Sequence, residues 1–327
     1  MLQSKDVSVV VQGAINEYTK QCLLSIRKSF PNAQIILSTW INSEIGDLDY
    51  DRVIFSKDPG ASIIDDVSGT LNNVNRQIIS TKSGLKYAKR KYILKTRTDI
   101  IWNDDKFLKY FALYDHRYKS KHFRNRILIC NYYTRNPNIL PLPFHISDWI
   151  AFGLNEDVNL YYDCSLQSLD DMRWFVNKEK KQRRFYINLL AKYVPEQHIC
   201  SSFIAKFDEV SFNCFYDASK ENIRITEEML ANDFVVLDYK TQLNISFPKY
   251  NPNRYVEKFT LVSNKQWNEL YKEYCEKKYG VNYYLRRVRN KTFYLLLILR
   301  LDILVVLHKL HLKEKVKKLL GRYNFKK

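Results

Sequence analysis

The first hundred residues alternate between short apolar runs and segments with helical periodicity, and this alternation constrains the fold more than any other feature. The apolar runs lie at residues 7–11, 34–38, 52–55 and 92–95. Over 18–30 and 74–88, apolar residues recur every three or four positions, as in helices. Apolar strands separated by helices are typical of a parallel sheet covered on both faces. We therefore expect an α/β fold with a mostly parallel central sheet and helices on both faces.

The order of elements becomes less regular after residue 105. We expect further strands at 127–130, 149–152 and 233–237, a long proline-containing loop over 134–148, and mainly helix over 165–209. No internal repeat or flexible linker is evident. We expect one large domain over residues 1–280, followed by a basic helical region over 281–327.

The positive charge of the chain is concentrated in two segments. The chain carries 53 Lys+Arg and 35 Asp+Glu, a net charge of +18. Residues 81–135 contain 15 basic and 4 acidic side chains, and residues 283–327 contain 13 and 2. So basic a protein is expected to bind nucleic acid, an anionic membrane or phosphorylated substrates. For the first segment, a solvated face is an equally good interpretation.

The second basic segment is also strongly apolar. Its apolar runs, 293–299 and 303–307, are separated by Arg300 and Asp302. These charges offset most of the gain from inserting the apolar residues, and each run is too short for a clean membrane span. A helix lying in the headgroup plane fits better, so we expect residues 283–327 to bind an anionic membrane surface. The alternative is a C-terminal helix packed on the body.

The cysteine spacing and the first six residues indicate the cellular compartment of the protein. No two of the six cysteines have Cys-x-x-Cys spacing, so a zinc site is not expected. Residues 1–6 lack the charged and apolar regions of a signal peptide. We expect a cytosolic protein with reduced thiols.

Polar residues follow the predicted strands where ligands usually bind, beyond the carboxyl ends of a parallel sheet. They are Gln12, Gly13, Thr39, Trp40, Arg97 and Asp99. Alternation puts Arg97 and Asp99 on the same side of their strand. The guanidinium suits a phosphate and the carboxylate suits a divalent ion. The alternative is a surface ion pair.

Three other positions are candidates for binding or catalysis. Arg76 lies near the start of a predicted helix, a natural anion site, or simply on an exposed helix face. Asp148 precedes an apolar strand and suits a general base, or else a turn or cap. Glu196 follows a proline in the first turn of a helix, where an acidic residue is ordinary. Walker, Gly-x-Gly-x-x-Gly and kinase motifs are absent from the sequence.

In combination, these segments resemble the WavE lipopolysaccharide-synthesis family, bacterial proteins similar to GT-A glycosyltransferases. The matching segments are 9–13, 38–40, 75–81, 84–85, 92–99, 145–149, 152–153 and 195–197. They occur in the expected order over about residues 5–210. The C-terminal third carries no resemblance that we can name.

The resemblance implies that residues 1–280 form a GT-A-like catalytic domain. Such an enzyme moves a sugar from a nucleotide-sugar donor to a lipid-linked or core glycan in lipopolysaccharide or capsule synthesis. The residues that would border the nucleoside are Gln12, Gly13, Thr39 and Trp40. Arg76 and Arg97 would face the diphosphate.

The resemblance also suggests which residues would bind a divalent metal ion and which would act as the general base. GT-A enzymes usually bind Mn²⁺ or Mg²⁺ through Asp-x-Asp, whereas this chain has Arg97-x-Asp99 with one carboxylate. Asp99 is thus the candidate metal ligand, and metal dependence stays open. Asp148 and Glu196 are the candidates for deprotonating the acceptor hydroxyl, with Asp148 slightly favoured.

Two other functions are compatible with the sequence. A nucleic-acid-binding protein would use the charge and the 24 Tyr and 18 Phe, but no known binding motif is present, so no nucleic-acid partner is expected. A non-catalytic scaffold of a membrane glycan-assembly complex would keep the fold without turnover. The favoured interpretation is a transferase at the inner face of the cytoplasmic membrane.

Overall fold

A seven-stranded sheet forms the centre of the computed structural model, which describes residues 2–65, 70–114, 116–117, 122–176, 178, 189–250, 258–278 and 280–309. The strand order is β10-β8-β9-β6-β1-β2-β3. The strands are β1 (Val7–Gln12), β2 (Gln34–Trp40), β3 (Arg52–Ser56), β6 (Tyr92–Arg97), β8 (Ile127–Cys130), β9 (Ala151–Leu154) and β10 (Phe234–Leu237). All except β9 run in the same direction. The predicted α/β class with a mostly parallel sheet is confirmed.

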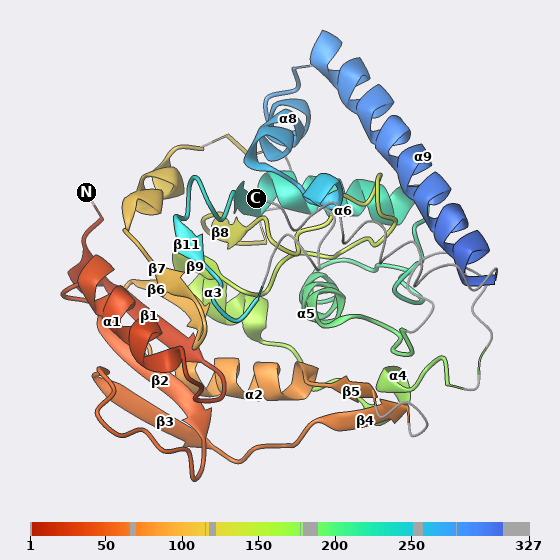
Figure 1. Cartoon of the computed structure of the whole chain (residues 1–327). Helices are drawn as coiled ribbons and strands as arrows, with labels where there is room; N and C mark the ends of the chain where they lie inside the picture. The colour runs from red at the N-terminus through yellow and green to blue at the C-terminus, as the bar shows by residue number, and fades with distance from the viewer. Residues whose placement is uncertain are drawn as a thin grey trace, which may run out of the picture.

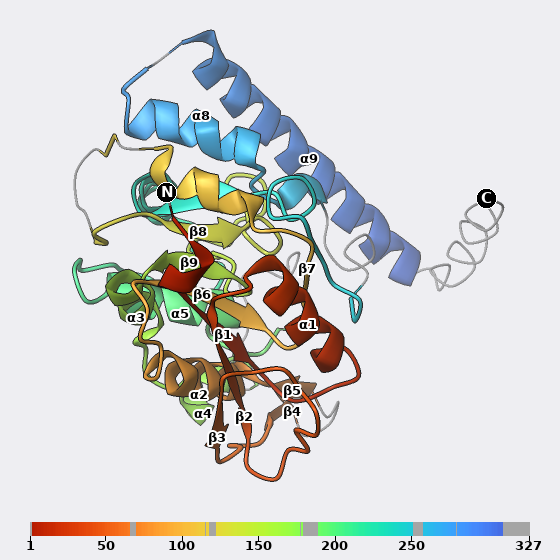
Figure 2. The ribbon, with the colours of Figure 1, turned by 90° about the vertical axis from the view of Figure 1, so that its left-hand side faces the viewer.

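Helices cover both faces of this sheet (Figure 2). Helix α1 (Thr19–Ser29) lies on one face. The other face carries α2 (Val74–Leu85), α3 (Asn155–Tyr162) and α5 (Pro195–Ile204). Helices α6 (Lys220–Asn232) and α8 (Asn264–Tyr274) pack on the edge strand β10. Because both faces are covered, β1 is buried along its whole length, as its apolar run predicts.

Helix α2 lies directly on β1 and β2. A Cβ at Gly84 would lie 2.5 Å from Val10 Cγ1 and 3.0 Å from Ser38 Cβ, so only glycine permits this approach. Two hydrogen bonds fix the helix in position. Ser38 Oγ donates to the Ser80 carbonyl at 2.6 Å, and Ser80 Oγ donates to Gln12 Oε1 at 2.6 Å.

The reversed direction of β9 brings residues 131–150 to the edge where the parallel strands end. Strand β8 finishes at that edge, and β9 starts there because it runs back antiparallel to β6 and β8. Lys95 of β6 pairs with Ala151 of β9, which brings Asp148 and Trp149 close to the end of β6. The predicted long loop is therefore confirmed and lies at the carboxyl edge.

Several short elements lie around this core, and most of them were not expected. They are η1 (Ser4–Asp6), β4 (Ser62–Asp65), β5 (Thr70–Asn72), β7 (Ile101–Trp102), η2 (Lys106–Ala112), α4 (Leu169–Met172), β11 (Ile245–Ser246) and η3 (Lys258–Thr260). Strands β4 and β5 pair with each other, as do β7 and β11. The expectation of mainly helix over 165–209 is only partly met, by α4 and α5. Residues 177 and 179–188 lie outside the described residues.

Helix α9 (Val281–Lys309) spans 29 residues and runs along the side of the molecule away from α1 (Figure 1). Arg286 ties it to the body through Glu227 of α6, at 2.6 Å, and through Glu273 of α8. The predicted helical region thus begins as expected, while residues 310–327 lie outside the described chain and the domain boundary at 280 stays a prediction. None of the described helices is both long enough and apolar enough to cross a membrane.

Candidate active site at the carboxyl edge of the sheet

Arg97 and Asp99 form a bidentate salt bridge at the end of β6. Arg97 Nε and Nη2 donate to the two carboxylate oxygens of Asp99, each at 2.8 Å. The guanidinium lies over the ring of Trp149, 4.4 Å from its centroid, and Nη2 also donates to the Tyr250 hydroxyl at 2.9 Å. Burial alone would lower the pKa of Arg97, but the bonds and charge of Asp99 outweigh it and raise that pKa. The arginine is therefore a fixed, permanently charged group.

Asp148 is held by side chains from three elements. Its Oδ2 accepts a hydrogen bond from Gln77 Nε2 of α2. Its backbone carbonyl accepts from Lys95 Nζ of β6 and from the Tyr162 hydroxyl of α3, the latter at 3.2 Å. Lys95 is completely buried, and this burial lowers its pKa to about 8 against the opposing charge of Asp148. Asp148 is thus positioned rigidly although it precedes its strand.

Glu196, the second residue of α5, is buried near Asp148. Burial first, and the negative charge of Asp148 second, raise the pKa of Glu196 to about 8. His145 Nε2 lies 3.9 Å from Glu196 Oε2, while its Nδ1 donates to the Tyr133 carbonyl at 2.8 Å. Burial and the charge of Arg135 lower the pKa of His145 to about 3. Near neutral pH, Glu196 is therefore mostly protonated and His145 is uncharged.

The connection that carries His145 and Asp148 has unusual backbone geometry. Tyr133 (φ 69°) and Phe144 (φ 59°) are both in the left-handed region, which is costly for residues other than glycine. The Arg135 amide donates to the His145 carbonyl at 2.9 Å and joins the two ends of this connection. Arg135 is itself buried, and its Nε lacks a hydrogen-bond partner within the described part of the chain. Such strain and an unsatisfied buried donor are typical of functional sites.

The predicted nucleoside-bordering residues lie at the ends of β1 and β2. Gly13 has φ 129°, and a Cβ there would lie 3.1 Å from Thr98 Oγ1, so glycine is required. Thr39 is fully buried, with its Oγ1 3.3 Å from Ser43 Oγ. Trp40 is only 8% exposed, so little of its ring is open to a stacking base. Their role at the nucleoside stays a prediction.

Arg76 is paired with a carboxylate that the sequence did not indicate. Its Nε and Nη2 donate to the two oxygens of Asp58, at 2.7 and 2.6 Å, just beyond the end of β3. Nη1 donates to Asn73 Oδ1 at 3.2 Å. Among the described residues, no hydrogen bond joins Arg76 to Asp99 or Asp148. The structure therefore groups Arg97, Asp99, Asp148 and Glu196, and leaves Arg76 outside that group.

The donor set does not fit a divalent ion as it stands. Mn²⁺ and Mg²⁺ take oxygen ligands, yet both oxygens of Asp99 accept from Arg97. In the described ranges, no three His, Cys, Asp or Glu side chains gather as metal ligands. Arg97 occupies one lone pair on each Asp99 oxygen and its charge repels a second cation there, so the metal role of Asp99 stays a prediction. Arg97 already supplies positive charge at this position.

Sequence reasoning did not identify several residues that build this site. Gln77 and Lys95 position Asp148 through hydrogen bonds. The Tyr250 hydroxyl accepts a hydrogen bond from Arg97, and the Arg135 amide donates to the His145 carbonyl within the connection 131–150. For Lys95 a signal was available, because it is a charged residue inside an apolar run and shares the side of Arg97. Nothing in the sequence links Tyr250 to β6, which it meets only through the tertiary fold.

The architecture and the site are those of an α/β protein that binds its ligand at the carboxyl edge of a mostly parallel sheet. Mostly parallel α/β sheets bind their ligands beyond the carboxyl ends of the strands, and here that edge carries buried, fixed and charged side chains. Residues 7–303 match the family model for WavE lipopolysaccharide synthesis. The chain belongs to this family, whose bacterial members take part in lipopolysaccharide biosynthesis. The match extends well beyond the segments that carried the resemblance and includes most of α9. No curated protein matches the chain.

Proposed function

We propose that this protein is a glycosyltransferase that moves a sugar from a nucleotide-sugar donor to a lipid-linked or core glycan in lipopolysaccharide or capsule synthesis. Family membership supports the biosynthetic role. The observation that carries the transfer reaction is the pair of buried carboxyl groups, Asp148 and Glu196, at the carboxyl edge beside Arg97. A buried carboxyl group whose pKa is raised, as that of Glu196 is, beside a second carboxylate is typical of acid–base sites.

Asp148 acts as the general base in this proposal. Its Oδ2 is fixed by Gln77. Its other carboxylate oxygen takes the proton of the acceptor hydroxyl while the hydroxyl oxygen attacks the sugar carbon and the diphosphate leaves. Glu196 stays protonated, because its burial first and the charge of Asp148 second oppose its ionisation. A neutral carboxyl group beside the base donates a hydrogen bond to a substrate hydroxyl without competing for its proton.

Arg97 stabilises the leaving diphosphate in this proposal. Its positive charge is fixed between two aromatic rings, and guanidinium groups bind phosphate oxygens in the same two-pronged manner as carboxylates. The diphosphate therefore competes with Asp99 for Arg97. Gly13 lets the backbone approach the donor closely, while Gln12, Thr39, Trp40 and Arg76 complete the donor side.

The first test measures donor binding and turnover separately. UDP-, GDP-, CMP- and dTDP-sugars are screened by thermal shift with and without Mn²⁺, and turnover is followed as release of free nucleotide. A ligand at about 100 times its dissociation constant adds about 2.7 kcal/mol of stability, a readily visible shift. We expect one nucleotide class to stabilise the protein.

Asp148→Asn provides the discriminating variant, with exposed Asp47→Asn as the matched control. We expect Asp148→Asn to keep donor binding and to lose nucleotide release by about 100-fold or more, since general-base catalysis contributes about that much. Asp47→Asn should behave as the wild type. If Asp148→Asn turns over normally, Asp148 is not the base. Donor binding without turnover in the wild type favours the scaffold alternative.

A further inference from the structure

Helix α9 presents an apolar stripe to solvent along most of its length. Among its apolar side chains that are half or more exposed, six recur at intervals of three, four or seven residues. We call them the apolar stripe: Leu285, Val288, Leu295, Leu299, Ile303 and Val306. At about 100° per residue, these positions share one side of the helix. A surface helix usually turns such a stripe inward.

The opposite side of α9 is the side that packs on the body. Arg286 is buried between two glutamates, and Asn290 Oδ1 accepts from Asn136 Nδ2 at 3.5 Å. Leu297 is buried in a small core with Leu140 and Leu142 of the connection that leads to Asp148. The helix is therefore docked through one face, and its apolar stripe remains exposed. An extended exposed apolar surface of this kind indicates an interaction site.

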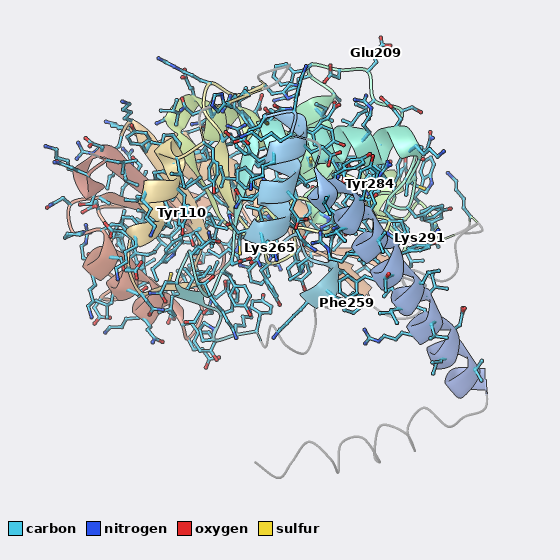
Figure 3. All side chains as sticks on the ribbon, turned by 90° about the horizontal axis from the view of Figure 1, so that it is seen from above. Tyr110, Glu209, Phe259, Lys265, Tyr284 and Lys291 are labelled. Atoms are coloured by element: carbon cyan, nitrogen blue, oxygen red, sulfur yellow. The ribbon has the colours of Figure 1, made fainter. Side chains whose placement is uncertain are left out.

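Basic side chains line both edges of the apolar stripe. Arg287 and Lys291 are exposed along one edge and Arg300 along the other, and Figure 3 shows Lys291 on the outer surface of α9. The following eighteen residues of the sequence, 310–327, contain seven Lys or Arg and one Glu. A second copy of α9 packed on the stripe would bring these like charges together, which is unfavourable. An anionic surface suits them.

We infer that the apolar stripe of α9 binds the surface of an anionic lipid bilayer, with the helix axis in the plane of the membrane. The apolar side chains enter the boundary between headgroups and acyl chains, and the flanking basic residues contact the anionic headgroups. This interaction needs no sugar transfer, so it stands or falls independently of the proposed enzymatic activity.

Vesicle flotation of the full chain tests the inference. We expect the wild type to float with vesicles that contain phosphatidylglycerol and much less with phosphatidylcholine alone, with binding weakened by salt. The variant L295Q/L299Q/I303Q should bind at least tenfold more weakly. Its matched control is L24Q/L113Q/L166Q, which changes three leucines of similar exposure elsewhere and should float as the wild type.

The charge contribution is tested with a second pair of variants. R287Q/K291Q should lower binding about 25-fold at low salt, about fivefold for each charge, and much less at high salt. K28Q/K86Q removes two exposed lysines elsewhere and is the matched control. Thermal unfolding verifies that each variant is folded.

Three results would overturn the inference. The first is a folded wild type that does not float with phosphatidylglycerol vesicles at low salt. The second is an apolar-stripe variant that floats as well as the wild type. The third, seen by sedimentation velocity, is a wild-type dimer that the same three substitutions dissociate without changing flotation, because a second copy would then occupy the stripe.

Discussion

Glu196→Gln tests the electrostatics of the site, because it removes a titrating group with little change of shape. The pKa of Glu196 is raised from 4.5 to about 8, by burial first and by the charge of Asp148 second. Between those two pH values, the unfolded chain has released a proton that the folded protein still holds. The stability contributed by neutral Glu196 is complete below pH 4.5 and is lost as the pH rises towards 8.

The magnitude follows from the width of that interval. From 4.5 to about 8 is about 3.5 pH units, and each unit corresponds to about 1.4 kcal/mol, so the upper limit is about 5 kcal/mol. Water entry and local relaxation around the ionised side chain reduce this loss. We expect Glu196→Gln to gain about 2–4 kcal/mol relative to the wild type between pH 5 and pH 8.

Urea unfolding at pH 5, 6, 7 and 8 measures this difference in the free energy of unfolding. The same substitution at the exposed Glu44 controls for the loss of one carboxylate. The Glu196→Gln variant should become progressively more stable than the wild type as the pH rises. A difference that stays constant from pH 5 to pH 8 would refute the reasoning, because it would mean that Glu196 ionises alike in the folded and unfolded chains.

Two further predictions concern packing. Gly84→Ala should lower the free energy of unfolding by about 1–3 kcal/mol. The added methyl group overpacks against β1, and this cost outweighs a gain of about 1 kcal/mol in helix propensity. Denaturant unfolding measures this variant and its control, Ser83→Ala. Arg286→Met should cost about 3–5 kcal/mol, because it leaves two carboxyl groups buried without their guanidinium, whereas Arg224→Met at an exposed ion pair should cost less than about 1 kcal/mol. Equal losses for the two arginine variants would contradict the buried ion pairs.

The sequence predicted the central strands because their burial on both faces leaves a continuous apolar run. It did not predict the direction of β9, because the apolar pattern of a four-residue strand is the same whether the strand runs parallel or antiparallel to its neighbours β6 and β8. That direction is set by the connection 131–150, which stays at one edge of the sheet. The short pairs β4–β5 and β7–β11 were missed because two to four residues show no periodicity.

The site was predictable where it depends on one strand and not where it depends on several. Alternation along β6 put Arg97 and Asp99 on the same side, and the structure pairs them. Gln77 and Lys95 reach Asp148 only because α2 and β6 meet the start of β9. Those contacts follow from the packing of three elements, which no local pattern specifies.

For α9, the sequence indicated the character of the helix but not which side faces outward. Apolar residues occur almost all round the helix, so periodicity alone does not select a face. Arg286 and Arg289 were counted with the basic surface, yet Arg286 is buried between two glutamates and Arg289 pairs with Glu269 at 2.8 Å. The charges that face outward are therefore fewer than the sequence suggests, and they lie beside the apolar stripe.

The connection between β8 and β9 links the two proposals physically. On one side, Leu140 and Leu142 pack against Leu297 of α9, and on the other side the connection ends at Asp148. Two left-handed residues and the Arg135–His145 backbone bond leave it few alternative conformations. If α9 binds a bilayer as proposed, this connection is the segment through which a force on the helix would reach the carboxyl edge of the sheet. We therefore expect membrane binding to change the geometry at Asp148.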